Sequence, residues 1–171
     1  VFMLFLPKPM GYFFLLCIAF YFLTQVVGAR SSLGILGGIA YAYASYGPII
    51  VSVGHDTKMQ AMGYLPALLA ALWLIYQRKY LWGAALTALF SGLLIGMNHL
   101  QITYYFLIIA IFMTIGFIIQ WIKEKQFKHL AISLGIALSA AIIGACFNMV
   151  TLATTSDYSK ATMRGGQLKI D

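Results

Sequence analysis

Apolar residues along the chain gather in long runs that are separated by short polar stretches. Each run holds roughly 17–22 residues, the number that an α-helix needs to cross about 30 Å of hydrocarbon at 1.5 Å per residue. The runs lack the period-two alternation over about ten residues that a transmembrane β-barrel requires. The pattern therefore predicts membrane-spanning helices.

The predicted fold is all-α, a polytopic transmembrane helical bundle that forms one domain over residues 1–171, with about six membrane-spanning helices. We expect the helices at residues 11–28, 32–51, 59–76, 80–97, 102–122 and 130–151. Pro7 and Pro9 should stop any helix that enters the first segment, and Pro48 and Pro66 could break later ones. A polar tail follows from Thr154, and we expect the chain to be a fragment of a longer protein.

Composition excludes an ordinary soluble domain. Of the 171 residues, 62% are hydrophobic and 9% are charged, whereas globular domains carry about 25% charged residues. The net charge of +7 comes mainly from loop residues and lacks the basic-aromatic pattern of a nucleic-acid surface, so membrane lipids are the expected partners and nucleic acid is not. Cys17 and Cys146 lie in apolar runs and read as small buried hydrophobic residues.

Loop charges predict the orientation. The loops after the first, third and fifth segments are basic, and the positive-inside rule places them in the cytoplasm. Their cations are Arg30, Arg78, Lys79, Lys123, Lys125 and Lys128. The opposite connections hold Lys58 alone, or no Lys or Arg between Asn98 and Tyr105. The loops near residues 54–58 and 98–105 are therefore expected on the outer side of the membrane.

The first polar constellation is the run Gly54-His55-Asp56-Thr57-Lys58 between two helical segments. An imidazole, a carboxylate and an ammonium group so close together could bind a phosphate, orient a sugar hydroxyl or form an ion-paired network. The alternative is a solvated turn in which Asp56 or Thr57 caps the next helix while Lys58 extends to lipid head groups.

The second constellation is Asn98-His99-Leu100-Gln101-Ile102-Thr103-Tyr104-Tyr105, which opens an otherwise apolar helix. Buried polar side chains need hydrogen-bond partners because hydrocarbon offers none, so these residues could line a hydrated cavity. The alternative is an interfacial anchor, with the tyrosines in an aromatic belt and Asn98 as a cap. His55 and His99 without a further ligand motif do not indicate a zinc site.

The third constellation is the polar tail, in which Arg164 precedes Gly165 and Gly166. A guanidinium group beside free backbone amides could bind phosphate. The alternative is a flexible exit into an outer domain.

In order and spacing, these stretches resemble bacterial YfhO-like membrane proteins over the whole chain. The resemblance rests on FLPKPMGY at residues 5–12, GHDTK at 54–58, NHLQITYY at 98–105, DYS at 157–159 and RGG at 164–166. It implies a longer parent protein related to the GT-C class of membrane glycosyltransferases. Such enzymes transfer a sugar from a polyprenyl-phosphate donor on the outer face, here to a cell-envelope polymer acceptor.

The resemblance also implies site residues. Those expected to bind substrate are His55, Asp56, Lys58, Asn98, His99, Gln101, Tyr104 and Arg164. No catalytic residue is assigned, because GT-C enzymes usually carry the catalytic carboxylate in a large outer loop that we expect to lie outside this chain. The family more often has an amide at the position of Asp56. No resident cofactor is expected; a divalent cation stays open, and the lipid-linked sugar is substrate.

Two other functions compete with the glycosyltransferase. A transporter or lipid flippase would need polar groups near the middle of the membrane, often at broken helices, whereas the polar groups here cluster at segment ends. A non-catalytic assembly subunit would use a small-residue face such as Gly34, Gly37 and Gly38 to pack against a neighbouring helix.

Overall fold

A computed structural model describes residues 6–161, and within this range the only regular elements are helices. They are α1 (Met10–Val27), α2 (Ser31–Ala42), α3 (Tyr46–Ser52), α4 (Asp56–Tyr76), α5 (Tyr80–Gly96), α6 (Leu100–Lys123), α7 (Phe127–Cys146) and α8 (Met149–Ala161). The all-helical prediction is confirmed.

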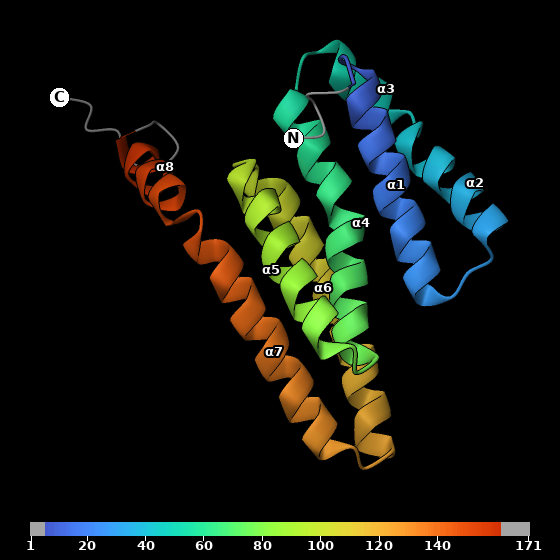
Figure 1. The fold of residues 1–171 in the computed structure, drawn as a ribbon. Helices are drawn as coiled ribbons and strands as arrows, with labels where there is room; N and C mark the ends of the chain where they lie inside the picture. Colours follow the sequence, from blue (N-terminus) through green and yellow to red (C-terminus); the bar gives the residue numbers. More distant parts are fainter. Residues whose placement is uncertain (1–5, 162–171) are drawn as a thin grey trace.

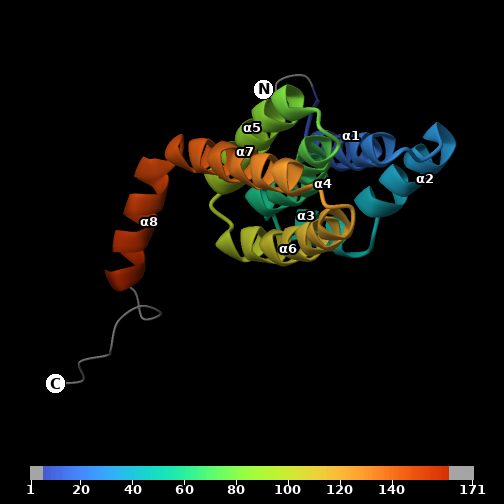
Figure 2. The same ribbon diagram turned by 90° about the horizontal axis from the view of Figure 1, so that it is seen from below.

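Helix α4 is the centre of the bundle (Figure 1). It packs against α1 on one side, with α2 outside α1, and against α5 on the other, with α7 outside α5. Helix α6 lies along α4, and α8 turns sharply away from the end of α7 (Figure 2). The most buried helix is α4, which keeps 67% of its apolar window inside the protein.

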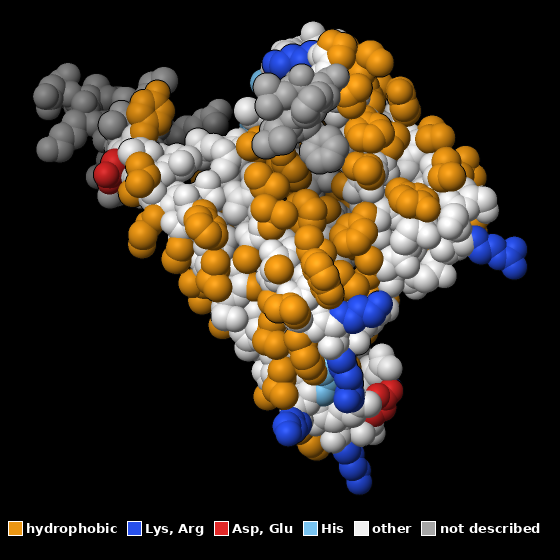
Figure 3. Space-filling model, in the orientation of Figure 1, with side chains coloured by type: hydrophobic (Ala, Val, Ile, Leu, Met, Phe, Trp, Pro, Cys, Tyr) orange, Lys and Arg blue, Asp and Glu red, His pale blue; other side chains and the backbone are white. Residues whose placement is uncertain are grey.

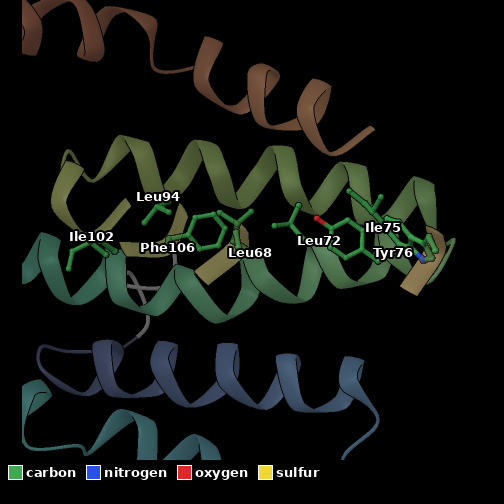
Figure 4. Close-up of a cluster of buried hydrophobic side chains, with 10 residues drawn as sticks. Leu68, Leu72, Ile75, Tyr76, Leu94, Ile102 and Phe106 are labelled. Carbon is green, nitrogen blue, oxygen red and sulfur yellow. The ribbon is translucent and has the colours of Figure 1, made fainter. Parts of the chain in front are cut away.

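The core joins α4, α5 and α6. Its buried members include Leu68, Leu72, Ile75, Leu94 and Phe106, whose side chains meet between these helices (Figure 4). The outer faces are also apolar, as one side of the molecule shows (Figure 3). On α6, Ile111 and Phe112 are 54% and 71% exposed. Apolar side chains on both the inside and the outside are expected where the surrounding medium is hydrocarbon.

Four helices are long and apolar enough to cross a membrane: α1, α4, α6 and α7. The bent pair α2–α3 makes a fifth if it counts as one span. Helix α5 has 17 residues, about 26 Å at 1.5 Å per residue, which is shorter than the usual hydrocarbon core of about 30 Å. By length and composition, the six expected spans are therefore found only in part.

The predicted helix over residues 32–51 is wrong as a single element. It is divided into α2 and α3, whose axes differ by 43°, with a break at Tyr43–Ser45. Pro48 explains the break, because it has no N–H to donate to the carbonyl of Ala44 and its ring crowds that carbonyl. In the first turn of α3, where no such bond is needed, Pro48 is tolerated. Pro66, by contrast, lies within an uninterrupted α4.

The predicted helix over residues 130–151 is also wrong at its C-terminal end. Helix α7 stops at Cys146, and a separate helix, α8, includes the polar residues after Thr154 that sequence analysis treated as a tail. The side-chain amide of Asn148 donates to the carbonyls of Gly92 and Gly144 at 2.7 and 3.3 Å. A short polar side chain that bonds nearby backbone in this way competes with helix continuation.

Glycines let two helix pairs approach closely. A Cβ atom added at Gly38 of α2 would lie 2.8 Å from the carbonyl oxygen of Cys17 in α1. One added at Gly144 of α7 would lie 1.9 Å from the hydroxyl of Ser91 in α5. The small-residue face predicted in the second segment therefore packs within this chain, against α1.

The loops gather at two ends of the bundle. At the first, which we call the basic end, Gln77 donates to the carbonyl of Val26 at 3.3 Å and Arg78 donates to Gln126 at 2.7 Å. This end holds the cations of the three basic loops, several of which form the blue lower tip in Figure 3. The opposite end, which we call the polar end, holds Lys8 and the loops before α4 and α6.

Candidate functional site

A side-chain hydrogen bond joins the first two polar constellations. The hydroxyl of Thr57, in the first turn of α4, lies 2.8 Å from Nε2 of His99, which immediately precedes α6. The two residues are 42 positions apart in the chain. The two stretches that were expected on the same side of the membrane therefore lie close together, at the polar end.

Asp56 forms an ion pair with Lys8, which approaches from the segment before α1. The side chains stay 63% exposed at Lys8 and 34% at Asp56, so solvent screens the attraction. Hydrogen bonding to Asp56 raises the pKa of the Lys8 ammonium group above its ordinary value. The Tyr12 ring lies 5.8 Å below the same ammonium group. The carboxylate of Asp56 is thus paired with the ammonium group of Lys8.

The capping alternative for this turn is not observed. His55 occupies the N-cap position of α4 and makes no side-chain capping bond. Asp56 is the first helical residue, where a negative charge is favourable near the positive end of the helix dipole. The Thr57 hydroxyl is bonded to His99 instead of the backbone.

Lys58 lies in the same first turn of α4. Its side chain is half-buried, and its ammonium group sits 5.2 Å from the ring centroid of Tyr46 in α3. That distance permits a cation–π interaction, which positions the charge without neutralising it. Lys58 is therefore held beside the site by an aromatic ring of the bent second segment.

His99 has a pKa below its ordinary value of 6.5. Burial is the largest cause, and the positive charges of Lys58 and His55 add to it. Both effects disfavour the imidazolium form. The side chains of Lys58 and His55 are therefore close enough to act electrostatically on His99, whose neutral form is favoured.

The remaining predicted residues lie around this group. Asn98 adopts a left-handed backbone conformation, with φ at 55°, and its side-chain oxygen accepts a hydrogen bond from Thr155 of α8 at 3.2 Å. Gln101 donates to the hydroxyl of Tyr105 at 3.0 Å, within its own helix. Tyr104 is 61% exposed, as an interfacial aromatic would be. Gln101 therefore bonds within α6 and Tyr104 is exposed, and neither takes part in the Thr57–His99 hydrogen bond.

Arg164 lies outside the described residues, so its relation to the site is not defined. Lys8, Tyr46, Thr57 and Thr155 belong to the polar end but were not among the predicted binding residues. Lys8 offered a signal, since it belongs to the FLPKPMGY stretch at residues 5–12 on which the family resemblance partly rests. Tyr46 offered none, because its position depends on the break between α2 and α3.

Among residues 6–161, no three His, Cys, Asp or Glu side chains are grouped so that they could hold a metal ion. What the polar end offers is a set of cationic and hydrogen-bonding groups: Lys8, His55, Lys58 and His99. Such groups suit an anionic ligand, above all a phosphate.

The fold, with its polar site at one end of the helices, is consistent with a helical membrane protein. The long apolar helices indicate the same class. No protein-family model, no curated protein and no solved structure matches the chain.

Proposed function

We propose that this chain is the membrane part of a GT-C-like glycosyltransferase, which transfers a sugar from a polyprenyl-phosphate donor to a cell-envelope acceptor on the outer face of a bacterial plasma membrane. The observation that carries the proposal is the convergence of the His55 and His99 stretches through the Thr57–His99 hydrogen bond. The YfhO-like resemblance supplies the reaction class.

The charges at the polar end support binding of the donor phosphate. Lys58 has a half-buried side chain, and its ammonium group, 5.2 Å from the Tyr46 ring centroid, has an aromatic neighbour in place of a carboxylate. A phosphate at the interface would accept hydrogen bonds from Lys58 and from the imidazole N–H groups of His55 and His99. As the glycosidic bond to the phosphate breaks, negative charge grows on the departing oxygen, and these groups would stabilise it.

Activation of the acceptor hydroxyl needs a carboxylate that can take a proton. Asp56 is a poor candidate, because its ion pair with Lys8 favours the carboxylate form and lowers its basicity. We therefore assign Asp56 to holding the segment before α1 against α4. The general base would come from a part of the parent protein beyond residues 6–161.

We further propose six crossings, with α2 and α3 together forming the second and α5 the fourth. The alternation of loops between the basic end and the polar end supports this topology. The concentration of Lys and Arg at the basic end supports its placement in the cytoplasm. The polar end, with the proposed site, would then face outward.

The position of the charges favours an enzyme at the surface over a transport path. In α1 through α6 the only charged residues are Asp56, Lys58 and Lys123, all within the first or last turn of their helix. A transport path for ions or charged substrates requires such groups at the middle of the membrane. The arrangement therefore supports the glycosyltransferase.

The test is glycosylation of the envelope polymer in cells that express the parent protein with Lys58→Gln. Lys125→Gln is the matched control, since it removes a cation from the basic end. We expect Lys58→Gln to reduce glycosylation about 10-fold or more, the scale of one charged hydrogen bond. Unchanged glycosylation in a Lys58→Gln, Arg164→Gln double variant, at normal protein abundance, would contradict the proposal.

A further inference from the structure

A cavity of about 180 Å³ lies among α4, α5, α6 and α7, below the polar end. Most of its walls are apolar, formed by residues such as Leu68, Leu72, Leu94 and Phe106. An apolar cavity of about 150 Å³ is enough to hold benzene. The space can therefore take several carbon atoms of a hydrocarbon.

One end of the cavity lies near the polar end of the bundle, at Thr103 of α6. Thr103, which lines it, donates a hydrogen bond to the backbone carbonyl of His99 at 3.4 Å, one helical turn away. The end of the cavity at Thr103 is therefore one helical turn from His99, and Lys58 is close enough to His99 for its charge to act on the imidazole.

The cavity opens sideways between α6 and α7. Leu107 of α6 and Ala141 of α7 both line it, although Leu107 is 50% exposed and Ala141 is only half-buried. The neighbouring outer surfaces of these helices are apolar, with Ile108 and Leu138 exposed. An occupant that enters here would come from the hydrocarbon of the membrane.

The hydroxyl of Thr87 is a buried polar group that needs a hydrogen-bond partner. Its side chain lines the cavity and is 1% exposed, and its hydroxyl has no hydrogen-bond partner among the described residues. Helical threonines usually bond the carbonyl four residues back, as Thr114 does with Ala110 at 2.6 Å. Thr87 lies nine residues before Gly96, the last residue of α5, which is at the polar end. At 1.5 Å per residue, Thr87 is therefore about 14 Å along the helix axis from the polar end.

Water is a poor occupant. A trapped water needs two to four polar partners, whereas most of the cavity wall is apolar and the Ser91 hydroxyl, which donates to the carbonyl of Ala88 at 3.2 Å, could only accept from the water. A carbon–carbon double bond satisfies both the apolar walls and Thr87, because its π electrons accept a weak hydrogen bond from a hydroxyl. A saturated chain would leave that hydroxyl unpaired.

We propose that this cavity binds an unsaturated hydrocarbon chain of a phosphate-bearing membrane lipid, with the phosphate at the polar end and a double bond against Thr87. The chain could belong to a bilayer phospholipid or to a polyprenyl phosphate. The inference rests on the proposed function for the placement of a lipid phosphate at the polar end, whereas binding of the hydrocarbon chain in the cavity does not depend on glycosyl transfer.

Photo-crosslinking of the 171-residue chain in phosphatidylcholine nanodiscs tests it. One arm uses phosphatidylglycerol with a diazirine on a monounsaturated acyl chain, and a second uses a diazirine-bearing polyprenyl monophosphate. The arm that labels the cavity residues identifies the lipid source. Labelling confined to the outward residues Ile111 and Phe112 in both arms would overturn the proposal.

Blocking variants make the test specific. Ala141→Phe should lower cavity labelling at least about fivefold, because the ring occupies the space of the chain, whereas the exposed control Leu138→Phe should change it by less than about twofold. Leu107→Trp, at the open mouth, provides a second blocker if Ala141→Phe fails to fold in a thermal-unfolding check. Equal labelling in blockers and control would also overturn the proposal.

Thr87→Val tests the double bond, since it keeps the shape of the side chain and removes the hydroxyl. We expect the wild-type chain to prefer the monounsaturated probe over its saturated analogue, and the variant to lose that preference. A preference that persists in Thr87→Val would overturn the assignment of the double bond to Thr87.

Discussion

The hydroxyl of Tyr80 lies 2.7 Å from Nδ1 of His129, and Nε2 of the same ring lies 3.0 Å from the carbonyl oxygen of Tyr76. A carbonyl only accepts hydrogen bonds, so Nε2 carries a proton, and in the neutral ring Nδ1 accepts from Tyr80. His129 is 6% exposed and meets the Trp121 ring at 4.7 Å. One imidazole thus connects the α4–α5 turn to α7.

His129→Phe should therefore destabilise the bundle. Phenylalanine keeps a ring against Trp121 but leaves the Tyr76 carbonyl and the Tyr80 hydroxyl without their partner, at a cost of about 2–4 kcal/mol. Thermal unfolding in detergent, followed by circular dichroism, measures the loss. The exposed neighbour Lys128→Ala is the control and should change the stability by less than about 0.5 kcal/mol. Equal stability in the two variants would show that the imidazole bonds contribute little.

The depressed pKa of His99 predicts a pH-dependent contact at the polar end. Because the unfolded chain binds the proton more tightly than the folded one, His99 stabilises the folded state fully above pH 6.5, and this stability is lost as the pH falls below that value. An NMR titration of the ring should give a midpoint below 6.5. Lys58→Gln should raise the midpoint, since it removes one of the charges that lower it. A midpoint at or above 6.5 in the wild-type protein would contradict the described environment.

Gly144→Ala should weaken the packing of α5 on α7. Its added Cβ would lie 1.9 Å from the Ser91 hydroxyl and 2.7 Å from the carbonyl of Ala88, an overlap that costs about 1–3 kcal/mol. Gly135 of the same helix is the matched control, because a Cβ there meets nothing within 4 Å. Gly135→Ala should instead stabilise α7 by about 0.5–1 kcal/mol. The same sign of change in both variants, measured by denaturant unfolding, would refute close α5–α7 contact.

The proposed topology predicts opposite accessibility of Arg78 and Thr57. Single cysteines at these positions, in a background without Cys17 and Cys146, should react with a membrane-impermeant maleimide from opposite sides of intact cells. Thr57→Cys should be labelled from outside, and Arg78→Cys only after permeabilisation. Labelling of both cysteines from outside would reverse the orientation and remove the outer site with it.

Helix identity and approximate position could be read from the sequence because the length of an apolar run reports directly on the thickness of the membrane it crosses. The break between α2 and α3 could not be placed, because a proline in a long apolar run is compatible with either outcome. Pro48 breaks its segment whereas Pro66 does not. At Pro66 the carbonyl four residues back, that of Met62, accepts a hydrogen bond from the Tyr41 hydroxyl at 2.8 Å. That partner comes from another segment, so the sequence of α4 alone does not indicate it.

The sequence also predicts only part of the site. The shared polar end of His55 and His99 follows from helix alternation, since α4 and α5 form a hairpin that returns the chain to its starting side. The pairing of Asp56 with Lys8 depends on the lateral approach of α1 to α4, which helix count does not specify. Helix α8 was missed because its low apolar content resembles a solvated segment, although Thr155 reaches Asn98.

The interruption at Tyr43–Ser45 divides the second segment between two neighbours. Helix α2 fits its glycines against α1, whereas α3 presents Tyr46 to Lys58 of α4. Each residue inserted into a helix rotates everything beyond it by about 100°, so an insertion within α2 would turn Gly38 away from Cys17. At the interruption an extra residue is absorbed by nonhelical backbone, and both interfaces keep their alignment. The bend is therefore the place in this segment where a residue can be inserted or deleted without rotating α2 or α3 relative to the helix that each one packs against.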